Sequence, residues 1–358
     1  MKTLISFIFL AIAITIGCTS SGSVDIRNSA MHVSLDSLLQ ATITEGSTPG
    51  VAVAVVSGER VLYSKAFGVR EVGAEQEVTT ADVFNFSSIV KTVTSTAVMQ
   101  QVERDGLVLD DHATNYLSAI DGDEEDPTIR HMLSHSSGIQ FSDQEPSDDG
   151  ALRPWDLVIA NPPGTKLQYS NAAFYTLGKI IEEQEGNSFE DYVDEQIFKA
   201  LGMNHSSIHS IEGLGDATVP HTIEESELIT VDRPEYDPRR VGNGIFYSTI
   251  EDMSVWAQLH LSKGTVNGQT MLSASSYDEI WKPNLETGWD EMKAAAGLGW
   301  FIGEVDGRRT ASHIGGTNGY SAALVIFPDD DRAMVIAGNS NKLPREALIE
   351  SIAEIIFR

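Results

Sequence analysis

Strand-forming segments stand at both ends of this chain, and helical patterns fill the sequence between them. Residues 50–68, GVAVAVVSGERVLYSKAFG, form two β-rich runs around a short hairpin signal at Gly58-Glu59. Residues 298–340 hold further runs, LGWFIGEVDGRRTASHIGG, YSAALVIFP and RAMVIAGNS, with turn residues at Asp306-Gly307 and in PDDD. Strands so distant in sequence, with helices between them, predict one antiparallel sheet that both chain ends build together.

The intervening part, from about residue 86 to 290, has the spacing of helices rather than strands. Helical patterns follow Ser88 and recur in TIRHMLSHSS, NAAFYTLGKIIEEQEG, SFEDYVDEQIFKALG and TIEDMSVWAQLHLSKG, with predicted helix stops at Gly106, Gly186, Gly202 and Gly264. Apolar residues at helical spacing also occur in SLDSLLQATITEG and in the closing LPREALIESIAEIIFR. The sequence therefore predicts an α+β fold, with an antiparallel five-stranded sheet flanked by terminal helices and an inserted, mostly helical region.

We expect residues 32–358 to form a single domain. Its sheet part would comprise about 32–85 and 291–358, and its helical part about 86–290. The seam between the two parts is the expected place for an active site. The sequence contains no internal repeat that would indicate a solenoid or a propeller.

The first residues have the features of an export signal. Residues 4–17, LISFIFLAIAITIG, are short for a membrane span but suit the core of a signal peptide over residues 1–17. Cys18 follows in TIGC, which resembles a bacterial lipoprotein box, and the polar residues 18–31 would form a tether. We expect an exported protein, in the periplasm or at the outer membrane, that contacts a membrane only through a lipid on Cys18. An ordinary secretory signal with an incidental cysteine is the alternative.

The charge balance excludes one large class of partner. The chain has 24 Lys and Arg against 52 Asp and Glu, a formal net charge of −28. Phosphate backbones require clustered basic residues, so nucleic acid is not expected as a partner. Cys18 is the only cysteine, which excludes a disulfide framework and a catalytic thiol in the mature domain.

The segment NFSSIVKTVTS, residues 85–95, places two serines before a lysine. In a helix that starts at Ser88, Lys91 lies on the same face and reaches the Ser88 hydroxyl, while Ser87 leads into the helix. Apolar neighbours would desolvate Lys91 and lower its pKa, so that the amine acts as a base. Alone the pattern is weak, because a chain of this length contains on the order of one such match by chance. A lysine whose amine extends to solvent is the alternative.

Two later segments carry residues of matching chemistry. In YSN, residues 169–171, Tyr169 could relay protons and the Asn171 amide could hold a substrate carbonyl or orient the lysine; an ordinary helix N-cap is the alternative. In HIGG, residues 313–316, Gly315 and Gly316 would let a substrate approach the backbone, and His313 would project into the cleft. A strand that ends in a glycine turn is the alternative there.

In this order the three motifs resemble the class C β-lactamase and penicillin-binding-protein-like family of serine hydrolases, which includes D-aminopeptidases, D-alanyl-D-alanine carboxypeptidases and carboxylesterases. The resemblance extends from about residue 48 to 340 and includes PGVAVAVV, TIRHMLSHSSGI, GNGIFYSTIEDM and GLGWFIG. It implies Ser88 as the acylated nucleophile, Lys91 as its base, Tyr169 as the proton-transfer group and Asn171 as the residue that positions Lys91 and the substrate. It also implies an oxyanion hole from the N–H groups of Ser88 and Gly316, without a metal or a cofactor.

His313 departs from the family pattern. Where the third motif begins with lysine, a permanent cation helps to hold a substrate carboxylate, whereas histidine is mostly neutral at pH 7. We therefore expect hydrolysis of a small ester, amide or D-amino-acid-containing substrate. A β-lactamase or D-alanyl-D-alanine carboxypeptidase is the first alternative, and a catalytically silent ligand-binding relative is the second.

Other conspicuous residues are assigned no site. Two histidine pairs have helical ligand spacing but lack the H-E-x-x-H context of a zinc protease: His131 with His135, and His205 with His209. The acidic segment DGDEEDP, residues 121–127, lacks the ligand pattern of an EF-hand. Three aromatic residues near the motifs are expected in the core: Phe84, Phe86 and Tyr320.

Overall fold

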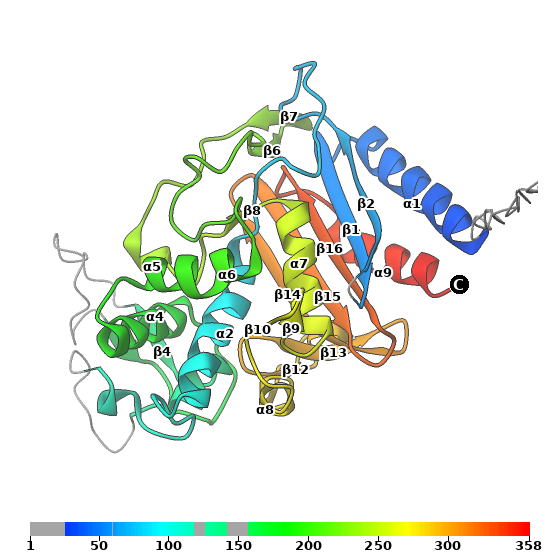
Figure 1. Cartoon of the computed structure of the whole chain (residues 1–358). Coiled ribbons are helices and arrows are strands. Elements are labelled where there is room, and N and C mark those ends of the chain that lie inside the picture. The colour runs from blue at the N-terminus through cyan, green and yellow to red at the C-terminus, as the bar shows by residue number, and fades with distance from the viewer. Residues whose placement is uncertain (1–25, 59, 118–125, 142–156) are drawn as a thin grey trace, which may run out of the picture.

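Strands from near both chain ends pair directly in a large antiparallel sheet (Figure 1). The computed structural model describes residues 26–58, 60–117, 126–141 and 157–358. In spatial order the strands are β11 (Leu285–Glu286), β12 (Ala295–Ala296), β13 (Phe301–Val305), β14 (Arg308–Thr317), β15 (Tyr320–Phe327), β16 (Arg332–Gly338), β1 (Gly50–Ser57) and β2 (Arg60–Gly68). The pairing of β16 with β1, together with the helices described below, confirms the predicted α+β fold.

In the described part of the chain the sheet has eight strands, so the predicted number of five is too low. The run at residues 298–316 forms two strands, β13 and β14, joined by a turn at Asp306-Gly307. The short strands β11 and β12 extend the sheet at the edge beside β13. β11 lies within the range assigned to the helical part, because two residues are too few to show the alternation of a strand.

The central strands are buried on both faces of the sheet. In β1, Val51 and Val53 point into one apolar cluster, whereas Ala52 and Ala54 point into another on the opposite face. This is the two-residue period of a strand, already visible in the alternating GVAVAVV. The small side chains of the alanine face leave room for α7 (Ile250–Leu261), which packs against β1 and β16.

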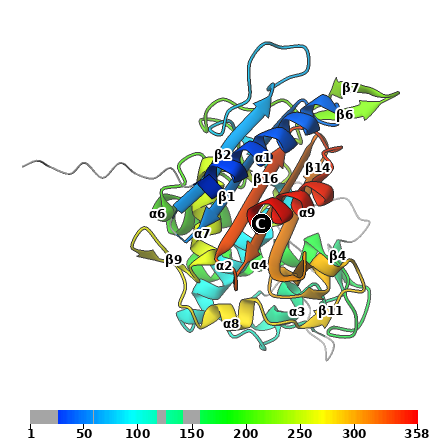
Figure 2. The ribbon, with the colours of Figure 1, turned by 90° about the vertical axis from the view of Figure 1, so that its right-hand side faces the viewer.

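Helices α1 and α9 cover the valine face. α1 (Ile26–Thr44) and α9 (Arg345–Ile356) contact each other, and Figure 2 shows both lying across the strands. The cluster beneath them combines apolar side chains from both helices and from the strands, including Leu35, Leu39, Val325, Ile336, Ile349 and Ile352. α1 already begins at Ile26, so the predicted tether of residues 18–31 is wrong over its last residues. Met31, inside that range, already packs against the cluster beneath α1.

The helical part covers the alanine face and extends beyond it (Figure 1). Its other helices are α2 (Val90–Glu103), α3 (Ile129–Leu133), α4 (Asn171–Glu185), α5 (Phe189–Val193), α6 (Lys199–Leu201) and α8 (Ser276–Ile280). Short antiparallel strand pairs also occur there: β4–β5 (Ile139–Phe141, Leu157–Ile159), β6–β7 (His221–Glu224, Glu227–Thr230) and β9–β10 (Thr265–Val266, Gln269–Thr270). α4 and α6 end at left-handed Gly186 and Gly202, as predicted.

The predicted export signal, Cys18 and most of the acidic segment 121–127 lie outside the described residues. Within the described ranges, no helix has both the length and the apolar character needed to cross a membrane. The site motifs all lie inside the described part of the chain, so their arrangement is seen directly.

A close contact joins β14 to the turn before α2. A Cβ atom on Gly315 would lie 2.0 Å from the carbonyl oxygen of Phe86, a distance that no side chain tolerates. β14 also contacts the 3₁₀ turn η1 (Ser87–Ile89), which leads into α2. Glycine at position 315 therefore lets the start of α2 rest directly on the sheet.

We expect Gly315→Ala to destabilise the fold by about 1–3 kcal/mol, the usual cost of overpacking, because the methyl group must displace the Phe86 carbonyl. Gly316→Ala is the matched control, since its Cβ would meet nothing closer than the Arg345 guanidinium at 3.7 Å. Urea unfolding of both variants measures the difference. Equal stability would show that β14 moves away from Phe86 without cost.

Candidate active site

The turn that carries the two serines separates their roles. Ser87 has a left-handed backbone with φ of 49° and is buried, 2% exposed. The side-chain oxygen of Asn85 accepts its N–H at 2.8 Å, and its own hydroxyl donates to the Gly316 carbonyl at 3.0 Å. Ser88 is only half-buried and lines a cavity. Ser87 therefore holds the turn in shape, and Ser88 is the serine that a substrate can reach.

Lys91 is enclosed in the first turn of α2, with 0% of its surface exposed. Its Nζ donates to Asn171 Oδ1 at 2.8 Å and to the backbone carbonyl of Asn243. The same atom lies 4.8 Å from the ring centroid of Tyr169 and 5.5 Å from that of Phe174. Among the described residues, no carboxylate lies within ion-pair distance of this amine.

This environment disfavours the charged form of the lysine. Burial, and secondarily the positive charge of Arg240, hold the pKa of Lys91 well below its ordinary value of 10.5. A neutral amine has two N–H bonds, and the bonds to Asn171 and to the Asn243 carbonyl use both. Its lone pair then remains available to accept a proton.

Tyr169 stands immediately before α4, whose N-cap is Ser170. Burial raises the pKa of Tyr169 to about 12, and a hydrogen bond with Ser88 acts in the opposite direction. The phenol is therefore protonated at neutral pH and contacts the serine directly. Its ring stacks on His135 at 4.3 Å, and His135 Nδ1 accepts the backbone N–H of Ser170 at 3.2 Å. These contacts fix the phenol between the lysine and the serine.

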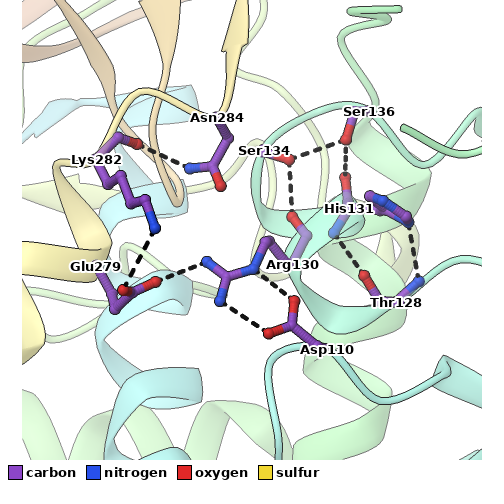
Figure 3. Close-up of polar contacts among 9 residues, drawn as sticks. All are labelled: Asp110, Thr128, Arg130, His131, Ser134, Ser136, Glu279, Lys282 and Asn284. Carbon is purple, nitrogen blue, oxygen red and sulfur yellow. Dashed lines mark hydrogen bonds and ion pairs between the residues drawn. The ribbon is translucent and has the colours of Figure 1, made fainter. Parts of the chain in front are cut away.

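The short helix α3, which precedes His135 in the chain, is held in place by ion pairs. Figure 3 shows Arg130 donating to Asp110 on one side and to Glu279 of α8 on the other, at 2.6 Å and 2.8 Å. The next residue, His131, is bound to the N-terminus of its own helix and contacts no site residue. α3 is thereby fixed to two neighbouring segments, and the loop after it positions His135 against the ring of Tyr169.

The HIGG motif of β14 presents the backbone of Gly316 to the cavity, whereas the side chain of His313 does not line it. Gly316 is exposed and lines the cavity beside the serines. His313 is buried at 1% exposure and packs on Phe301 with ring centroids 5.4 Å apart. Its Nδ1 lies 2.8 Å from the Ile314 carbonyl oxygen, and burial lowers its pKa to about 3. The prediction that His313 projects into the cleft is therefore wrong: the ring is buried against Phe301 and does not line the cavity, although Lys91 is close enough to help lower its pKa.

The cavity at the nucleophile has a volume of about 360 Å³. Its described lining residues come from both parts of the fold: Ser87, Ser88, Phe141, Asn171, Asp237, Arg239, Arg240, Asn243, Gly244 and Gly316. None of the three catalytic motifs includes residues 237–244. Asn243 acts through its backbone carbonyl, so its side-chain chemistry carried no signal, and Arg240 is distant in sequence from every motif.

The remaining aromatic residues and histidines named in the sequence analysis make contacts that hold the fold. Phe84, Phe86 and Tyr320 are core residues with no more than 1% exposure, as expected. His205 Nδ1 contacts the Leu214 carbonyl and His209 Nδ1 contacts Ser207. Within the described ranges, no group of three or more His, Cys, Asp or Glu side chains is arranged to hold a metal ion.

Comparison with known proteins finds similarity along almost the whole chain. The family model described as Beta-lactamase matches residues 35–356. The chain is 30% identical over 316 residues to Penicillin-binding protein 4 of Amycolatopsis lactamdurans, covering 83% of this chain and 82% of that protein. It is 23% identical to Beta-lactamase of Escherichia coli strain K12, covering 97% of both chains.

A solved structure has the same fold. The octameric penicillin-binding protein homologue from Pyrococcus abyssi matches with a TM-score of 0.78 and 23% sequence identity. The match covers 90% of this chain and 76% of that chain. At this identity the likeness supports the fold and no finer property.

We expect Lys91→Met to reduce kcat/KM by about 10²–10⁴-fold, the usual contribution of a general base. The same variant should also change how stability depends on pH. Since the folded-state pKa of Lys91 is lowered, the unfolded chain binds more protons below about pH 10.5, and the wild type loses stability as pH falls from there toward the folded pKa. The variant lacks this loss, so its free energy of unfolding relative to wild type should be greater at pH 7 than at pH 10.

Urea unfolding at both pH values measures this difference. Lys199→Met, at a lysine whose side chain is 63% exposed, controls for the loss of one positive charge. A difference between Lys91→Met and wild type that is the same at pH 7 and pH 10 would contradict the lowered pKa.

Proposed function

This chain belongs to the β-lactamase family of serine hydrolases, and within that family we propose that it hydrolyses a small ester or amide through an acyl-enzyme on Ser88. The observation that carries the proposal is the buried Lys91, which is bound to Asn171 and Asn243 and has its pKa lowered. A buried amine that has no carboxylate partner and lies beside an accessible serine is suited to act as a base for nucleophilic attack rather than as a structural cation.

In the acylation step, the Ser88 oxygen attacks the substrate carbonyl carbon while its proton passes to the Lys91 amine. The carbonyl π electrons move onto oxygen, which we place between the backbone N–H groups of Ser88 and Gly316. When the tetrahedral intermediate collapses, the bond to the leaving group breaks. The phenol of Tyr169 supplies the leaving group with a proton and is reprotonated through Lys91.

In the deacylation step, water attacks the acyl carbon by the reverse route. A proton from the water passes through Tyr169 and Lys91, and the bond between the acyl carbon and Ser88 oxygen breaks. Ser88 regains a proton, and a carboxylic acid leaves. Every step uses groups of this chain and water alone.

The state of His313 favours an ester or amide over a β-lactam. His313 is buried and neutral, so it supplies no cation for the carboxylate that relatives hold through a lysine at this position. Similarity to proteins named Beta-lactamase and Penicillin-binding protein 4 supports the rival, hydrolysis of β-lactams or cell-wall peptides. A silent ligand-binding role is disfavoured because Ser88, Lys91 and Tyr169 are all present and in contact.

An alkyl fluorophosphonate should label wild-type protein at one residue, Ser88, as located by peptide mass spectrometry. Ser88→Ala should abolish both labelling and hydrolysis of 4-nitrophenyl butyrate, because it removes the nucleophile. Ser87→Gly is the matched control, since glycine accepts the left-handed backbone at that position and leaves Ser88 in place. Its labelling should persist.

Two results would count against the proposal. Undiminished ester hydrolysis by Ser88→Ala would remove the acyl-enzyme mechanism altogether. Faster turnover of a chromogenic cephalosporin than of the butyrate ester would keep the mechanism and make the β-lactamase rival the better description.

We also propose that the protein is exported and held at a membrane by a lipid on Cys18. The support is the sequence alone: the apolar run of residues 4–17 followed by the single cysteine in TIGC. Expressed in a Gram-negative host, the wild type should incorporate labelled palmitate and partition into detergent, and Cys18→Ser should do neither. Mature wild-type protein that begins at another residue and stays in the aqueous phase would rule out the anchor.

A further inference from the structure

Arg240 supplies the cavity with a cation that has no carboxylate of its own. It is the last residue of η5 (Pro238–Arg240), and its Nη2 donates to Thr317 Oγ1 at 3.1 Å. Among the described residues, none offers Arg240 a carboxylate within ion-pair distance. The neighbouring Arg239 differs, because it binds the Asp237 carboxylate at 3.1 Å. The negative charge of Asp237 in the cavity is thus paired with Arg239, whereas the positive charge of Arg240 has no carboxylate partner among the described residues.

The proton-transfer tyrosine lies toward the His313 end of β14. Its ring stacks on His135 at 4.3 Å, and His135 in turn faces Phe301 with ring centroids 6.0 Å apart. Phe301 packs on His313 at 5.4 Å. Since Tyr169 protonates the leaving group in the proposed reaction, the leaving group departs on this side of the nucleophile.

Arg240 lies toward the opposite end of the same strand. Thr317, which it binds, follows Gly316 in β14, whereas His313 precedes it. With the substrate carbonyl oxygen placed at the N–H groups of Ser88 and Gly316, the two halves of a substrate must extend in opposite directions. The acyl half therefore extends toward Arg240, into the cavity that Arg240 lines.

The charge that Arg240 brings to the cavity wall is opposite in sign to the net charge of the whole chain. The protein carries a formal net charge of −28, yet the cavity wall presents an arginine close enough to lower the pKa of Lys91. An anion bound at this wall would face a planar guanidinium held in position by Thr317 and by the Gly244 carbonyl at 3.5 Å. Guanidinium groups pair with carboxylates through two parallel hydrogen bonds, which gives both affinity and orientation.

We propose that Arg240 binds a carboxylate on the acyl part of the substrate, so that the preferred substrates are half-esters or half-amides of dicarboxylic acids. This inference rests on the proposed acyl-enzyme function at Ser88. It differs from the recognition that a lysine at position 313 would provide, because that position lies on the leaving-group side. Arg240 is then a residue that determines specificity.

The test compares two esters with the same leaving group and acyl length: mono-4-nitrophenyl adipate, which has a free carboxylate, and 4-nitrophenyl hexanoate, which has none. The ratio of their kcat/KM values should fall about tenfold in Arg240→Gln, the effect of one charge-assisted hydrogen bond. Arg240→Lys should retain part of the preference. Arg309→Gln is the matched control, because this β14 arginine is 46% exposed, pairs with Asp329 and lies outside the cavity lining.

The dependence of kcat/KM on ionic strength tests the inference with the wild-type protein alone. Raising the ionic strength should lower kcat/KM of wild type for the adipate ester more than for the hexanoate ester, since screening weakens only the charged contact. An unchanged ratio in Arg240→Gln, or an equal fall in Arg309→Gln, overturns the inference while the proposed hydrolysis stands. Absence of Ser88-dependent hydrolysis of the neutral hexanoate ester overturns the proposed function, and the inference with it.

Discussion

The burial of one amine without a carboxylate partner is the constraint on which this site depends. Lys91 receives its hydrogen-bond acceptors from α4 and from the segment before α7, two elements far apart in sequence. Removing the amine from water costs free energy unless it gives up its charge. The surrounding fold therefore favours the neutral form of the Lys91 amine. Burying this amine lowers the free energy of unfolding, and the same burial keeps the amine able to accept a proton.

The two parts of the fold contribute different things to this arrangement. The sheet, closed by both chain ends and covered by α1 and α9, supplies a rigid edge in the form of β14. The helical part supplies the titratable groups, each at the start of a helix or in a braced loop. Gly315 lets the two parts touch backbone to backbone, which places the exposed Gly316 beside the half-buried Ser88.

Much of this arrangement was predictable from short-range pattern. The alternation in GVAVAVV, the helix stops at Gly186 and Gly202, and the spacing of Ser88 and Lys91 all report local geometry, and local geometry is what spacing encodes. The strand count, the orientation of His313 and the presence of Arg240 depend on tertiary packing. His313 follows the period of its strand, but which face of that strand meets the cavity is decided by neighbours distant in sequence. Arg240 belongs to no motif at all.

The hydrogen bond from Ser87 to the Gly316 carbonyl joins the turn that carries Ser88 to β14. Lys91 follows Ser88 by three residues in the same turn of chain, so both keep their positions relative to β14 when the sheet and the helical part shift, whereas Tyr169 moves with α4. Motion at the seam therefore changes the contact between Tyr169 and Ser88 more than the geometry between Ser88 and Gly316. The chemistry of this enzyme should be most sensitive to the width of that seam.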